Sequence, residues 1–235
     1  AATRLIVGAD LTLGAPFRRS RVALLVQDRD GYTNLCRLLT EAHRGRPKGE
    51  PLLDPSWLAV HPGGLVALLP SPYDPALAEL AADAFGDRAF LAVHRHLVSD
   101  DRRRSDEARL LSERTGLGVV ATGRPLYHDP SRRPVHDVLT CIRLGITLDD
   151  AGTRIAPNAE AFLRSEASMR HLFRDEPAWV DRTVEIASSC RFTMAELRYR
   201  FPSDELCPGE TADVALARQV EEHLPWRYPD GVPAK

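Results

Sequence analysis

The chain has 235 residues, of which 43% are hydrophobic and 27% are charged, and its formal net charge is −2 at pH 7. These values are ordinary for a soluble globular protein, and the length suits one large domain or one medium domain with an appendage. The near-neutral charge gives no electrostatic case for nucleic-acid binding by the whole chain, and no apolar run reaches the roughly 18 residues of a membrane span.

None of the four cysteines belongs to a C-x-x-C pair, so the sequence does not indicate a zinc knuckle or a redox motif. They are Cys36, Cys141, Cys190 and Cys207. We expect free thiols in a reducing cytoplasm, because the chain does not start with a basic-then-apolar signal segment. The chain lacks an initiator Met and enters a strand-like run almost at once, so we expect a piece of a longer protein.

Strand-like and helix-like segments alternate up to about residue 130. The expected strands are short and apolar and cover residues 4–13, 21–28, 64–70, 88–93 and 117–122. Between them we expect a helix capped by Asp30 that runs through Thr40, a helix over 74–86 and a charged helix over 101–116. Strands separated by helices favour parallel β/α units in a sheet covered on both faces.

The pattern becomes helical after about residue 132. Residues 133–146, 176–190 and 211–224 are expected helices, and Thr193 with Glu196 forms a capping-box pattern. We expect this half to be a mostly helical appendage laid against the α/β part.

The sharpest local feature is His94-Arg95-His96, which follows the fourth expected strand. Residues two apart on an extended chain point the same way, so both imidazoles could reach one metal, with Asp10 or His128 as a third ligand. The alternative is that one histidine caps the strand and the other is solvated. Asp10 leaves an apolar strand, where a carboxylate is costly unless it is exposed, paired or bound to metal.

Other polar clusters favour ordinary surface roles. His128-Asp129 and His136-Asp137 could be read as acid/base pairs, but adjacent residues rarely face each other. The arginines at 102–104, which acids flank, and those at 18, 19 and 21 are expected to be solvated. The chain contains no G-x-x-x-x-G-K-[ST] loop, G-x-S-x-G elbow or G-x-G-x-x-G fingerprint.

Several long stretches carry a resemblance to a known family. They are "LIVGADLTL", "LLVQDRDGYTNLCRLLTEAHR", "LAVHRHL" and "GLGVVATGRPLYHDPSRRPVHDVLTCIRLGITLDDAG". In this order they resemble the polymerase-and-histidinol-phosphatase (PHP) domain of bacterial C-family DNA polymerase III alpha subunits, and most closely the error-prone, damage-tolerance branch. The stretch from "RIAPNAEAF" to "LRYRFP" is similar to the helical segment that joins this domain to the polymerase core, and "RYPDGVPAK" resembles the run before the palm.

The resemblance implies a fold and an activity. The fold would be α/β: a truncated, distorted PHP-type β/α barrel over residues 1–130, without its N-terminal strands, and a mostly helical appendage over 131–235 that leads toward a palm outside the chain. The whole protein would be a DNA-directed DNA polymerase, a nucleotidyltransferase that acts in DNA replication, repair and damage-induced translesion synthesis. This chain alone would be inactive because the palm aspartates are not in it.

The departures from the family concern its metal site. The opening His-x-His motif is not in this chain, and Asp10 stands where metal-binding members carry a glutamate. Gly123, Arg124 and Leu126 occupy the positions of a frequent Asn-Asp pair and of a metal-binding histidine. The resemblance therefore implies a degenerate site with no catalytic residue, and Asp10 is its only inherited ligand. The candidate metal ligands are Asp10, His94, His96 and His128.

The resemblance also implies cofactors and partners. Mg²⁺ would serve the whole polymerase, whereas this chain would hold no metal, with residual Zn²⁺ or Mn²⁺ as the alternative. DNA would bind through the polymerase core outside the chain, and the sliding clamp and an accessory Y-family-like polymerase protein are the implied partners. We expect a cytoplasmic protein, not a membrane protein, with a structural or partner-binding PHP-like part. The competing hypotheses are a metal-dependent phosphoesterase or exonuclease of the PHP type and a pure interaction module.

Overall fold

The computed structural model describes residues 4–17, 20–198 and 209–231. Arg18, Arg19 and Cys207 lie outside the described residues. The chain divides into two compact units, residues 1–196 and 197–235. The first unit holds the sheet, and the second contains one described helix. The predicted domain boundary at residue 130 stays a prediction.

Five strands form one open sheet, and all five were expected from the sequence. They are β1 (Gly8–Thr12), β2 (Arg21–Val26), β3 (Leu65–Pro70), β4 (Ala89–His94) and β5 (Gly118–Thr122), in the order β1-β2-β3-β4-β5. β3, β4 and β5 are parallel, whereas β2 is antiparallel to both β1 and β3. The expectation that strands separated by helices pair in parallel was therefore wrong for β2 and β3. Between β1 and β2 lie only residues 13–20, too few for a parallel crossover.

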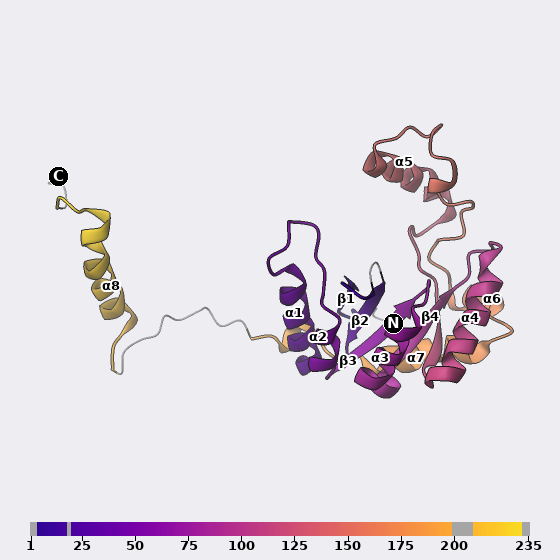
Figure 1. Ribbon diagram of the computed structural model, residues 1–235, viewed down its shortest axis with the longest axis horizontal. Helices are drawn as coiled ribbons and strands as arrows, with labels where there is room; N and C mark the ends of the chain where they lie inside the picture. The colour runs from indigo at the N-terminus through magenta and orange to yellow at the C-terminus, as the bar shows by residue number, and fades with distance from the viewer. Residues whose placement is uncertain (1–3, 18–19, 199–208, 232–235) are drawn as a thin grey trace. The chain divides into compact units, whose positions relative to one another are not determined.

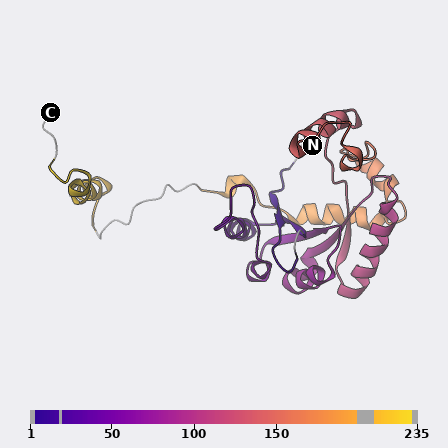
Figure 2. The same ribbon diagram turned by 45° about the horizontal axis from the view of Figure 1, so that its top comes forward.

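Helices cover both faces of the sheet. The helices α1 (Arg29–His43), α3 (Pro75–Phe85) and α4 (Asp100–Thr115) lie on one side, and α7 (Pro177–Ser189) crosses the other side (Figure 2). On the α7 side, Ile186 and Cys190 pack against Val66, Ala92 and Val120 of the three parallel strands. The α/β class is confirmed, and part of the second half does lie against the sheet. The described strands form an open sheet and not a closed barrel.

The first helix begins two residues earlier than expected. Asp28, not Asp30, is its N-cap, because the Asp28 carboxylate accepts a hydrogen bond of 2.8 Å from the backbone N–H of Gly31. Gly31 lies directly against Gly64: a Cβ at position 31 would stand 1.8 Å from the Gly64 carbonyl oxygen. The glycine therefore lets α1 approach the start of β3.

The remaining elements are helices, and most of them lie in the second half of the chain. α5 (Arg133–Leu144) ends at Gly145 in the left-handed conformation, and η4 (Met194–Glu196) is a single turn at the predicted capping box. The short helices α2 (Ser56–Val60) and α6 (Glu166–Leu172) were not expected. In the second unit, α8 (Ala212–Arg227) has Thr211 as its N-cap. Among the described helices, none combines the length and the apolar character needed to cross a membrane.

Candidate functional site at the carboxyl edge of the sheet

The sheet places Asp10 and His94 on the same face. Paired residues of neighbouring strands share a face, and the register runs Asp10–Ala23–Leu68–Phe90 across four strands. His94 lies four residues beyond Phe90 on β4 and therefore also shares that face. β1, β3, β4 and β5 run in one direction, because β1 and β3 are each antiparallel to β2. Their carboxyl ends meet at one edge, as expected for a functional site.

His94 is the buried member of the candidate set, with 6% of its surface exposed. The pKa of its imidazole is lowered to about 3, mainly by burial and in addition by the charge of Arg104, the neighbouring His96 and the charge of Arg124. Arg104 also donates a hydrogen bond of 3.2 Å to the His94 carbonyl oxygen. The ring is therefore neutral at pH 7, and its charged neighbours are cations, which oppose a metal cation at this position.

His96 lies beside His94, as the i, i+2 spacing predicted. The two ring centroids are 4.8 Å apart, with the planes tilted by 55°. The His96 Nε2 atom lies 2.9 Å from the carbonyl oxygen of Gly123, so it donates to the loop after β5 and leaves Nδ1 as the free ring nitrogen. Asn158 donates to the His96 carbonyl oxygen at 2.6 Å. His96 thus connects the segment after β4 with the loop after β5 and with the segment that contains Asn158.

Asp10 is bound by an arginine of the neighbouring strand. The Nε atom of Arg21 donates to Oδ1 at 2.9 Å, and its Nη2 atom contacts Oδ2. The sequence left three possibilities for Asp10, namely exposure, pairing or metal binding. In the structure the carboxylate is exposed and paired with Arg21. The Arg21 guanidinium neutralises the negative charge of the Asp10 carboxylate, which a metal ion would otherwise need as a ligand.

The loop after β5 does not complete a ligand set. Arg124 has a positive φ of 41°. Burial of its guanidinium lowers the Arg124 pKa, the nearby Arg21 and Arg104 lower it further, and Asp10 opposes this effect. His128 is exposed, and its neighbour Asp129 caps η2 (Pro130–Arg132) through Ser131. Within residues 4–17, 20–198 and 209–231, no three His, Cys, Asp or Glu side chains form a group that could hold a metal ion.

A second polar cluster, under α5, was underestimated from the sequence. The Arg133 Nε atom lies 3.3 Å from Oδ2 of the buried Asp137, and Arg133 also donates to the Ala156 carbonyl oxygen at 2.7 Å. Tyr127 packs edge-on against His136 with ring centroids 5.8 Å apart. His136 and Asp137 do lie near each other, with 3.9 Å between Nδ1 and Oδ1. The cluster is only partly satisfied, because the Tyr127 hydroxyl, Nε of Arg133, Nδ1 of His136 and Oδ1 of Asp137 are buried without a hydrogen-bond partner in the described part of the chain.

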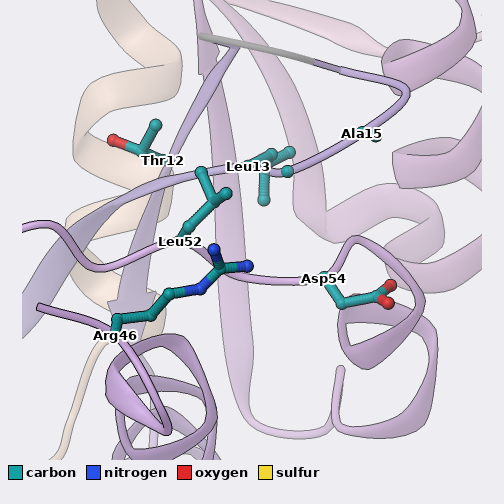
Figure 3. Close-up of a pocket in the computed structure, with 7 residues that line it drawn as sticks. Thr12, Leu13, Ala15, Arg46, Leu52 and Asp54 are labelled. Carbon is teal, nitrogen blue, oxygen red and sulfur yellow. The ribbon is translucent and has the colours of Figure 1, made fainter.

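Two of the surface hollows in the described part of the chain have charged residues in their linings. One, of about 550 Å³, follows β1 and has Arg46 and Asp54 at its opposite ends (Figure 3). Asp54 accepts hydrogen bonds from the N–H and hydroxyl of Ser56, which lower its pKa. The other, of about 690 Å³, lies at the start of α4, and its lining includes Arg95 and Asp175, which form an ion pair with each other. No candidate metal ligand lines either hollow.

Comparison with known proteins gives a consistent result. No family model matches the chain. "Error-prone DNA polymerase 1" of Agrobacterium fabrum is 35% identical over 243 residues, which cover 99% of this chain and 21% of that protein. "Error-prone DNA polymerase" of Anaeromyxobacter dehalogenans is 41% identical over 228 residues (92% and 20%), and that of Ralstonia nicotianae 34% over 256 residues (100% and 24%). The chain spans about a fifth of the length of these curated relatives and corresponds to a segment of such proteins.

Proposed function

We propose that this chain is a segment of an error-prone DNA-directed DNA polymerase that acts in DNA replication and damage-induced translesion synthesis. The observation that carries the proposal is the identity of 34–41% with proteins of that name over 92–100% of the chain. Nucleotide addition would then belong to the rest of the protein, with Mg²⁺ as its cofactor. Binding to DNA, to a sliding clamp and to a Y-family-like accessory protein would be properties of the whole polymerase.

Within that polymerase, we assign the α/β unit to the PHP type and give it a structural or partner-binding role. The donor set does not suit a catalytic metal, because Arg21 binds the carboxylate of Asp10 and the charges of Arg104 and Arg124 act on His94. Leu126 cannot ligate, and its backbone N–H instead donates to the Ala161 carbonyl oxygen at 2.8 Å. These contacts favour a scaffold over a metal-dependent phosphoesterase.

Primer extension by the full-length gene product tests the polymerase assignment. The full-length protein should extend a primer in the presence of Mg²⁺, on an undamaged template and past a template lesion, whereas the 235-residue chain should extend neither. A full-length protein that leaves both primers unextended would contradict the proposal.

A further inference from the structure

α5 is amphipathic in the opposite sense to α1, α3 and α7, which bury their apolar side chains. Its apolar side chains are exposed: Val135 by 47%, Val138 by 42%, Leu139 by 59% and Ile142 by 70%. Their spacing of i, i+3, i+4 and i+7 is that of a helix face that packs against a core. The face that is buried instead carries Asp137, Thr140 and Cys141. We call the four exposed residues the α5 apolar face.

The polar contacts under α5 fix this orientation. Arg133, in the first turn, binds the Ala156 carbonyl oxygen and approaches Asp137, and the His136 ring packs on Tyr127. Rotating the helix to bury its apolar face would break the Arg133–Ala156 hydrogen bond and turn the side that carries Asp137 outward, although Nδ1 of His136 and Oδ1 of Asp137 have no hydrogen-bond partner among the described residues even in the present orientation. In the observed orientation the α5 apolar face points outward.

α5 stands away from the sheet, on the long connection between β5 and α6 (Figure 1). Its main contact with another helix or strand is with the adjacent η2. The exposed residues form a row on one helix, whereas isolated exposed apolar residues are common on any surface. Such a row is typical of a surface that another protein segment covers.

We propose that the α5 apolar face is the docking site for the remainder of the same polymerase chain, and this inference rests on the proposed function. The relatives are about five times longer than this chain, which covers 20–24% of them, so most of such a polypeptide lies outside these residues. The occupant is an apolar surface of that remainder.

The size of the face favours this occupant over a second copy of the chain. A helix of 12 residues is about 18 Å long and about 10 Å wide, which gives a contact on the order of 200 Å². A stable interface between separate molecules buries roughly 800 Å² on each partner. A covalently linked surface needs far less, because the link supplies a high effective concentration.

Hydroxyl-radical footprinting of the full-length protein tests the inference. Ile142 and Leu110 are matched probes, since each lies on a helix and is 70% exposed in this unit. We expect oxidation of Val138, Leu139 and Ile142 to be several-fold slower than in the unfolded protein, and oxidation of Leu110 to be much less affected. Ile142→Glu should restore oxidation at Val138 and Leu139, whereas the control Leu110→Glu should leave their protection unchanged.

Three results would overturn the inference. Oxidation of Ile142 at the unfolded rate, in a full-length protein that extends primers, would exclude docking while leaving the proposed function intact. Protection of Ile142 that disappears on dilution would assign the face to a second copy. A full-length protein without primer extension would remove the proposed function and the docking inference with it.

Discussion

Arg21 of β2 holds the carboxylate of Asp10 on β1 in a two-point ion pair, with Nε 2.9 Å from Oδ1. The pair spans the β1–β2 hairpin diagonally, because Asp10 is opposite Ala23 and Arg21 is opposite Thr12. The one carboxylate that the family resemblance retains as a metal ligand thus has a cationic partner in the same sheet. This ion pair is the structural basis for the proposal that the carboxyl edge of the sheet has a structural role and not a metal-dependent one.

Replacing Asp10 should have little effect on stability. Both side chains of the pair are about half exposed, at 42% for Asp10 and 50% for Arg21, and exposed ion pairs contribute about 0–1 kcal/mol. We expect Asp10→Asn to lower the free energy of unfolding by less than about 1 kcal/mol, measured by urea denaturation. Asp100→Asn, which removes the exposed partner of Arg103, is the matched control. A much larger loss for Asp10→Asn alone would indicate a ligand role.

Gly31→Ala should destabilise the first unit. The added methyl would meet the Gly64 carbonyl oxygen at 1.8 Å, and this contact cannot be relieved by rotating a side chain, because the oxygen belongs to the backbone and the Cβ position is set by it. Forced overpacking of this kind costs about 1–3 kcal/mol, which a thermal or urea unfolding curve will detect. Gly123→Ala is the control, because the nearest atom to its added methyl is 3.7 Å away. Equal stability of the two variants would contradict the close approach of α1 to β3.

The burial of His94 should make stability depend on pH. Its pKa is about 3 in the folded protein and 6.5 in an unperturbed imidazole, so between these values the unfolded chain binds more protons. Stability should therefore fall as pH decreases from about 6.5 toward 3, by up to about 1.4 kcal/mol per pH unit. Urea denaturation at several pH values should show a shallower dependence for His94→Gln.

Arg95 should contribute more to stability than the other arginines near the start of α4. Its guanidinium lies 4.5 Å from the Phe173 ring centroid, donates to Asp175 at 2.9 Å and is largely buried. We expect Arg95→Ala to cost about 1–3 kcal/mol of unfolding free energy, since it removes a hydrogen-bonded charge and a ring contact. Arg103→Ala, at an exposed site with acidic neighbours, should cost less than about 1 kcal/mol. The reverse order in denaturation experiments would contradict this assignment.

Most of the sheet could be predicted from sequence, because short apolar runs bounded by turns identify strands without tertiary information. Strand direction was harder. The few residues between β1 and β2 were a usable signal for an antiparallel pair, and it was missed. The connection from β2 to β3 contains α1 and α2 and is long enough for either direction, so its length does not decide the pairing.

The candidate site was predictable only where its members are close in sequence. The i, i+2 spacing of His94 and His96 correctly placed the two rings together. The partner of Asp10 was missed, because Arg21 was interpreted as part of a solvated loop and the hairpin was not recognised. The orientation of α5 could not be predicted, because its apolar spacing alone indicates a core-facing helix. Only the buried contacts of Arg133 and Asp137 show which side faces inward.

Metal content is the most direct test of the central claim that the α/β unit is a scaffold without a catalytic metal. The purified protein should be incubated with Zn²⁺ or Mn²⁺, desalted and analysed by elemental mass spectrometry, in parallel with Asp10→Asn and His94→Ala. We predict far less than one equivalent of metal per chain for all three proteins. One or more equivalents in the parent protein, lost in both variants, would contradict the account and establish a working metal site.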